Sequence, residues 1–142
     1  MSTPRASVRL AREPRLVIDR AARAGYPREA CGVLLGTRHV DTPVVSFATV
    51  ARNLDDEQAH DHYELDPADL YRAEELARAA GLEVLGVWHT HPDHSAVPSE
   101  LDRERAWPGW SYLIVPVDSG TPGGVRSWTL VEDRFIEEQV IA

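Results

Sequence analysis

Residues 83–92 read EVLGVWHTHP, an apolar stretch that runs directly into two histidines. A short continuous apolar run without alternation is typical of a strand that is buried on both faces. Residues 83–88 therefore predict an interior strand. Since His89 and His91 are separated by one residue, their imidazoles project to the same face of an extended chain, within reach of one metal ion.

The sequence on either side of this stretch alternates between helix and strand patterns. Pro67 follows Asp66 at an N-cap position and Gly81 stands where the same helix should end. Residues 51–66 are polar and aperiodic, which predicts a long loop. The predicted helices cover residues 15–24, 67–80, 99–106 and 134–141, and the predicted strands cover 30–36, 43–50, 83–88, 111–117 and 125–131. This order predicts one domain over residues 1–142, of the α/β or α+β class, built on a mixed sheet.

Composition limits the classes of function. The chain has 142 residues, 43% of them hydrophobic and 27% charged, so a globule with a substantial core is expected. A formal net charge of -8 would repel a phosphate backbone, which argues against nucleic acid as a partner. Cys31 is the only cysteine, and no stretch has the length of a signal peptide or a membrane span. A cytoplasmic protein without a membrane partner is expected, and its oligomeric state is left open.

A third candidate ligand follows the histidines. Asp102 lies eleven residues after His91 and could return a carboxylate oxygen from the first turn of the helix predicted at 99–106. Two nitrogens and one oxygen suit Zn²⁺ and leave a fourth tetrahedral position open for water, although iron or manganese would also accept these donors. Catalysis would then need a glutamate as general base, which periodicity alone does not select.

The order of these residues resembles a known motif. His89-Thr90-His91-Pro92, then Ser99 after six residues and Asp102 after two more, is similar to the motif of the JAMM/MPN+ (Mov34/MPN/PAD-1) zinc metallopeptidases. The glutamate that this family carries shortly before an apolar run is matched by Glu29 in PREACGVLLG, residues 27–36. The resemblance extends from about Val8 to Trp128. It implies a three-layer α/β domain with a curved mixed sheet flanked by helices, in a cytidine-deaminase-like arrangement.

The resemblance also implies a chemistry. It assigns one Zn²⁺ to His89, His91 and Asp102, the general base to Glu29, and a hydrogen bond to the oxyanion to Ser99. The implied reaction is hydrolysis of a peptide or isopeptide bond. The compact length is similar to that of stand-alone bacterial members, which implies a substrate at the C-terminal Gly-Gly end of a ubiquitin-like or sulfur-carrier protein.

Other functions remain open at this point. One is a deubiquitinase-like isopeptidase acting on ubiquitin-like conjugates, but little sequence between Asp102 and Trp110 is available for a second substrate-binding insertion. Another is a non-catalytic MPN scaffold, which the complete set of ligands disfavours. A third is a zinc hydrolase of small molecules.

Simpler structural roles also remain open for individual residues. His89 and His91 could be strand-edge histidines without a metal, and Ser99 could serve only as an N-cap. Glu29 could be a solvated charge. Cys31 is expected to be a buried hydrophobe without a catalytic role.

Two further features lie away from the motif. His60 and His62 belong to an acidic loop, which is expected to be solvated and is alternatively a weak second metal site or a substrate-contacting flap. Trp107 is expected either to cap the core or to border a substrate channel.

Overall fold

Helices and strands alternate along the computed structural model, which describes residues 7–55 and 62–142. In chain order the elements are β1 (Ser7–Leu10), α1 (Arg12–Gly25), β2 (Cys31–His39), β3 (Thr42–Ala48), α2 (Pro67–Ala80), β4 (Glu83–Pro92), α3 (Glu100–Arg105), β5 (Ser111–Asp118), β6 (Thr121–Pro122), β7 (Arg126–Val131) and β8 (Arg134–Ile141). The helix predicted at 67–80 is confirmed, with Asp66 as N-cap and Gly81 as C-cap. Within the described ranges, no helix is long and apolar enough to cross a membrane.

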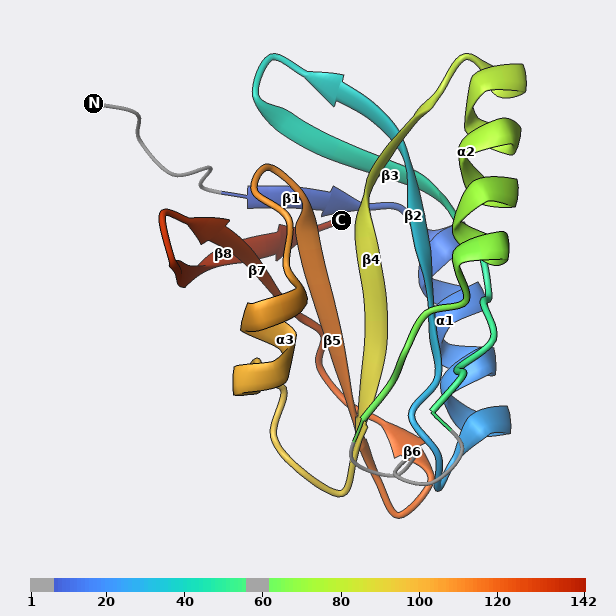
Figure 1. Ribbon diagram of the computed structural model, residues 1–142, viewed down its shortest axis with the longest axis vertical. Coiled ribbons are helices and arrows are strands. Elements are labelled where there is room, and N and C mark those ends of the chain that lie inside the picture. The colour runs from blue at the N-terminus through green and yellow to red at the C-terminus, as the bar shows by residue number, and fades with distance from the viewer. Residues whose placement is uncertain (1–6, 56–61) are drawn as a thin grey trace.

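The strands form one sheet that curls back on itself. Its order is β4-β2-β3-β1-β8-β7-β5-β6, and β4 also pairs in parallel with β5. Strand β1 is parallel to β3 and to β8, whereas β2 is antiparallel to both β3 and β4. The pairing of β4 with β5 closes the sheet into a barrel-like surface (Figure 1). The predicted α/β class with a curved mixed sheet is confirmed.

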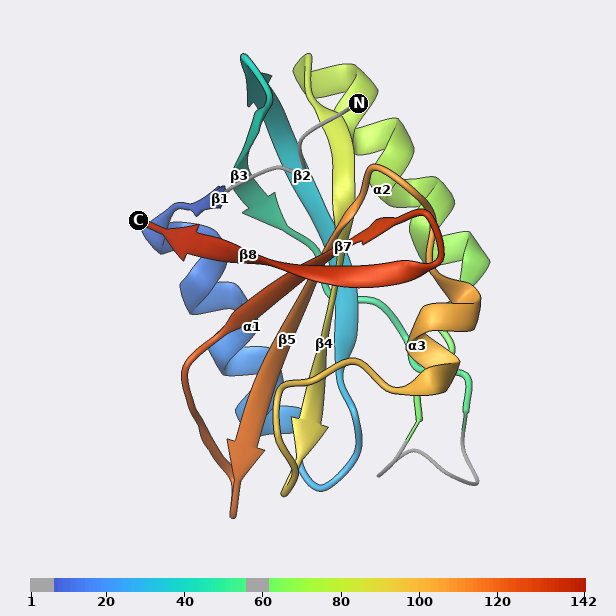
Figure 2. The same ribbon diagram turned by 90° about the vertical axis from the view of Figure 1, so that its left-hand side faces the viewer.

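Side chains of β2 alternate between two hydrophobic cores. Leu34 lies in the larger core together with Ile18 of α1. Val33 and Leu35 pack instead with Ala73 of α2. Figure 2 shows α1 and α2 on opposite sides of β2 and β4. Strand β2, predicted at residues 30–36, therefore lies in the middle layer between two helices.

The structure corrects the last predicted element. Residues 134–141, predicted to be a helix, form strand β8, which pairs with β7 and β1. Glu137 and Glu138 favour a helix locally, but they point to opposite faces of the sheet. Glu137 accepts hydrogen bonds from Arg126 at the surface, and Glu138 is buried, where it accepts one from Ser127 at 2.8 Å. Pairing with strands distant in sequence outweighs helix propensity here.

Gly32 occupies a position where β2 has no room for a side chain. A Cβ atom there would lie 1.8 Å from the carbonyl oxygen of Thr49 and 2.3 Å from Nε1 of Trp88. The indole N–H of Trp88 donates a hydrogen bond of 2.8 Å to the same carbonyl. A backbone segment and a fully buried ring would both have to move.

We therefore expect Gly32→Ala to lower the free energy of unfolding by about 3 kcal/mol. Urea denaturation followed by tryptophan fluorescence measures the change. Gly124→Ala is the matched control, because a Cβ there meets nothing within 4 Å, and its effect should stay within about 0.5 kcal/mol. Equal midpoints for the two variants would contradict the packing described.

Candidate metal centre

The two histidines lie near the end of β4, in the interior of the sheet. His89 is paired with Cys31 of β2 on one side and with Ile114 of β5 on the other. His89 and His91 are 0% and 2% exposed. Strand β2 pairs with β4 as far as His89, and β5 pairs with β4 through His91, so neighbouring strands hold the backbone of both residues. Their Nε2 atoms lie 3.0 Å apart.

Asp102 reaches the histidines from α3. Ser99 is the N-cap of this helix, and its Oγ accepts a hydrogen bond from the backbone N–H of Asp102 at 3.0 Å. In return, Oδ2 of Asp102 accepts one from the N–H of Ser99 at 2.8 Å, which completes a capping box. The same Oδ2 atom lies 3.4 Å from Nε2 of His89 and 3.5 Å from Nε2 of His91. The cap therefore directs the carboxylate at the histidine pair.

These three atoms have the spacing of donors around a tetrahedral metal ion. Metal–ligand bonds of about 2.0–2.2 Å at tetrahedral angles place neighbouring donor atoms roughly 3.3–3.6 Å apart. The separations of 3.4 and 3.5 Å fall in that range, and the separation of 3.0 Å between the two Nε2 atoms is slightly shorter. Three protein donors also leave a fourth position open, as catalytic zinc sites do. The donor set fits zinc.

The two imidazole rings are held in different ways. Nδ1 of His91 lies 2.7 Å from the carbonyl oxygen of Ser95 and donates to it, which leaves the Nε2 lone pair available to a metal. The ring of His91 also stacks on His94. Nδ1 of His89 has no hydrogen-bond partner among residues 7–55 and 62–142, but its ring stacks on Tyr63 with centroids 4.4 Å apart. Packing therefore holds His89, and a hydrogen bond orients His91.

The surroundings favour the protonation states that a metal centre needs. Burial lowers the pKa of His89 below its ordinary value, although the Asp102 carboxylate opposes this shift. Burial tends to raise the pKa of Asp102, but the two histidines and the N–H of Ser99 hold that pKa well below its ordinary value. Metal ions bind the neutral imidazole and the ionised carboxylate. Both groups are accordingly prepared to act as ligands.

Glu29 approaches the same centre from the segment before β2. The residue is 3% exposed, and one of its carboxylate oxygens lies within 4.8 Å of ring nitrogens of both His89 and His91. Thr90, which points away from the two histidines, ties this segment to β4. Its Oγ1 accepts a hydrogen bond from the N–H of Ala30 at 2.8 Å, and its own N–H donates to the Ala30 carbonyl at 3.0 Å. The histidine pair is therefore shared by two carboxylates, those of Glu29 and Asp102.

Sequence reasoning missed Asn53, which joins Glu29 to the loop after β3. Its Nδ2 donates to the carbonyl oxygens of Glu29 at 3.0 Å and His62 at 3.2 Å. Its Oδ1 accepts from the backbone N–H groups of Asp55 and Glu64, both at 2.9 Å. A side-chain amide can make about four hydrogen bonds, and Asn53 makes all of them. A single asparagine within a polar loop belongs to no sequence pattern that would indicate this role.

Cys31 takes no part in the donor set. Cys31 is buried, and burial raises the pKa of its thiol to about 12, so it stays protonated at neutral pH and packs as a hydrophobe. His60 lies outside the described residues. The alternative roles of His60 and His62 as a second metal site or a substrate contact therefore stay predictions.

The sequence and the fold of this chain are similar to those of known proteins. Residues 14–131 match a family profile described as prokaryotic homologues of the JAB domain, Prok-JAB. The desampylase of Haloferax volcanii is 40% identical over 115 residues, which cover 80% of this chain and 78% of the relative. The CysO-cysteine peptidase of Mycobacterium bovis is 28% identical over 120 residues, covering 84% and 80% of the two chains. The solution structure of protein DSY2949 from Desulfitobacterium hafniense superposes with a TM-score of 0.83 at 32% identity, covering 94% of this chain and 91% of that one.

Proposed function

This chain belongs to the Prok-JAB family, and we propose that it is a zinc-dependent peptidase acting at the C-terminal Gly-Gly end of a ubiquitin-like or sulfur-carrier protein. The bond it hydrolyses is a peptide or isopeptide bond. The observation that carries the proposal is the triangle of donor atoms from His89, His91 and Asp102 with the buried carboxylate of Glu29 beside it. The relatives named as a desampylase and a CysO-cysteine peptidase support hydrolysis of bonds to carriers of this kind.

In the proposed centre, Asp102 is a ligand and Glu29 is not. The Oδ2 atom of Asp102 is within 3.5 Å of both Nε2 atoms, a separation that suits two ligands of one ion. Glu29 does not belong to this triangle. Its carboxylate lies nearby and can reach a water molecule. The chemistry that zinc supplies when bound is Lewis-acid activation, which lowers the pKa of water to about 7 and polarises a carbonyl group.

Glu29 moves the proton in the proposed reaction. Water adds to the carbonyl carbon of the bond to be cleaved, and Glu29 accepts the proton that the water releases. When the carbon–nitrogen bond breaks, Glu29 delivers this proton to the departing amine. Asn53 donates to the carbonyl oxygen of Glu29, and Thr90 accepts from the N–H of Ala30 in the same peptide unit, so the base is positioned before the substrate arrives.

Ser99 has a hydrogen-bonding role left to perform beyond its cap. Its Oγ accepts from the N–H of Asp102, but its own O–H proton is not used by that bond. We propose that this O–H donates to the negatively charged oxygen that develops on the substrate carbonyl. Ser99→Ala should then lower kcat by about 10²–10³, whereas Ser99→Thr should retain most of the activity.

This test must distinguish the N-cap role of Ser99 from its proposed role in catalysis. Loss of an N-cap destabilises a protein by about 1 kcal/mol, so zinc content and the unfolding midpoint are measured on the same Ser99→Ala sample. Full zinc content with a large loss of kcat supports the oxyanion role. If activity falls only in proportion to bound zinc, Ser99 acts solely by directing Asp102.

The substrate class is tested with two substrates that share one carrier. In the first, a cysteine follows the Gly-Gly end in a peptide bond, and in the second the same end is joined to a lysine side chain. Mass spectrometry follows the release of carrier ending in Gly-Gly from each. Faster release from the first substrate supports carrier processing, and faster release from the second supports the isopeptidase alternative. Cleavage of neither substrate would remove the proposal.

A further inference from the structure

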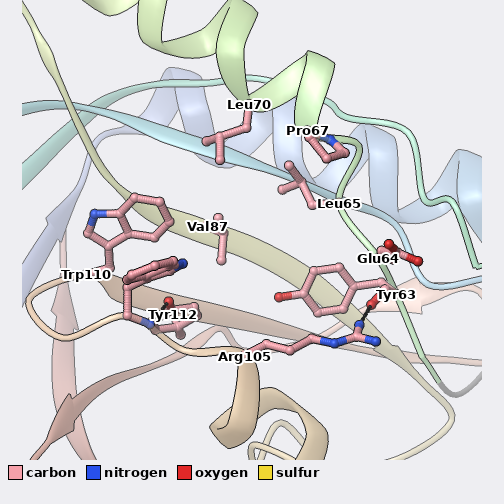
Figure 3. A pocket seen from close by; sticks show the side chains of 10 residues that line it. Tyr63, Glu64, Leu65, Pro67, Leu70, Val87, Arg105, Trp110 and Tyr112 are labelled. Carbon is pink, nitrogen blue, oxygen red and sulfur yellow. Dashed lines mark hydrogen bonds between the residues drawn. The ribbon is translucent and has the colours of Figure 1, made fainter.

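A pocket of about 320 Å³ lies beside the proposed centre. Figure 3 shows Leu65 and Leu70 on the wall formed by α2 and the segment before it, and Trp110 and Tyr112 on the opposite wall. Val87 of β4 lies between the two walls (Figure 3). The lining is mostly aliphatic and aromatic, so the pocket suits an apolar group.

Tyr63 is shared by the pocket and the centre. Its ring stacks on His89 with centroids 4.4 Å apart, and it also lines the pocket, with the phenol pointing inward (Figure 3). Arg105 of α3 donates a hydrogen bond of 2.6 Å to the carbonyl oxygen of Tyr63, which holds this residue from the other wall. The pocket therefore begins one aromatic ring away from a proposed metal ligand.

We propose that this pocket binds one large apolar side chain of the carrier tail, from one of the two residues that precede the terminal Gly-Gly. The inference rests on the proposed function. An extended chain advances about 3.3 Å per residue, so these two residues lie roughly 7–10 Å from the cleaved bond. That reach carries a substrate side chain past the ring of Tyr63, whose centroid lies 4.4 Å from that of His89.

The two glycines give a reason for such a pocket. They have no side chains for the enzyme to recognise, so side-chain specificity for a tail comes from residues further upstream. Trp107 also lines the pocket and is 65% exposed, and its backbone N–H donates to the hydroxyl of Tyr112 at 2.6 Å. Exposed tryptophan beside an apolar pocket is typical of surfaces that bind proteins. Of the two predicted roles for Trp107, this position favours the border of a substrate channel.

The first measurement compares two carriers that differ only in the tail. One ends in Leu-Leu-Gly-Gly and the other in Ala-Ala-Gly-Gly, each followed by the same cysteine. Burial of a leucine side chain corresponds to about a 10- to 100-fold difference in kcat/KM in favour of the leucine tail.

The second measurement repeats the comparison with the pocket filled. Leu70→Trp on α2 places a larger side chain in the pocket, and the ratio between the two tails should fall to nearly one. Tyr71→Trp is the matched control, since Tyr71 lies on the same helix, is 63% exposed and does not line the pocket. This variant should keep the ratio of the native protein.

A binding measurement tests the pocket assignment independently of the hydrolysis reaction. Fluorescence anisotropy with Glu29→Gln protein measures the affinity for each carrier without requiring cleavage. If no carrier is cleaved but the leucine tail binds at least about tenfold more tightly, the pocket assignment stands and the proposed function fails. If carriers are cleaved at equal rates, or Leu70→Trp leaves the preference unchanged, the pocket assignment is overturned while the proposed function stands. The pocket assignment would also be overturned if the preference between substrates depended on the residue after the cleaved bond and not on the tail residues before it.

Discussion

His91→Ala protein should purify with almost no zinc and should hydrolyse a carrier substrate only at the background rate. His91 supplies one of three donor atoms in the triangle, and its Nδ1 proton is already committed to the Ser95 carbonyl. Removal of a ligand leaves two donors, which is too few for a zinc site that also needs an open position. Inductively coupled plasma mass spectrometry gives the zinc content, and the cleavage assay gives the rate.

A second histidine provides the control for this prediction. His39→Ala changes an exposed histidine at the end of β2 and should leave both zinc content and rate unchanged. Urea denaturation of both variants establishes that each is folded. Full zinc occupancy in folded His91→Ala protein would place the metal elsewhere, and the loop that carries His62 would then be the next region to test.

Glu29→Gln should lower kcat by about 10²–10⁴ while zinc stays bound. Glutamine has nearly the shape of glutamate, so the segment held by Asn53 and Thr90 keeps its conformation, but an amide cannot accept the proton from water. The variant is assayed at saturating zinc, and its zinc content is measured on the same sample. Loss of rate without loss of metal is the result expected of a general base.

The same experiment decides between the two carboxylates near the histidine pair. Glu29 and the two histidines also form a buried group with the spacing of metal ligands. Asp102→Asn is therefore measured beside Glu29→Gln, and it should lose zinc. If instead Glu29→Gln loses zinc and Asp102→Asn retains it, the roles proposed for Glu29 and Asp102 are exchanged.

Much of the centre could be predicted because its elements are local in sequence. His89 and His91 share a face because of their spacing, and Ser99 and Asp102 form a capping box because three positions separate an N-cap from N3. The family membership confirms the resemblance on which the choice of Glu29 depended. The interior strands were recognisable from their uninterrupted apolar runs.

The remaining features depend on contacts between distant segments. Strand β8 was predicted as a helix, because its pairing with β7 and β1 cannot be read from its own sequence. Strand β1 was not predicted because it is short and is held by pairing with β3 and β8. Tyr63 reaches both His89 and the pocket only after the chain has folded. The role of Asn53 was likewise not predictable, because its four hydrogen bonds link segments that carry no periodic pattern.

The most direct test of zinc-dependent hydrolysis uses one carrier that extends beyond its Gly-Gly end and one preparation of the protein. The preparation is divided into zinc-loaded, chelator-treated and zinc-restored samples, and mass spectrometry records the carrier mass after incubation with each. The zinc-loaded and zinc-restored samples should yield carrier that ends in Gly-Gly, and the chelated sample should leave the carrier intact. Equal trimming by the chelated sample, or no trimming by folded and zinc-loaded protein, would contradict a zinc peptidase at this centre.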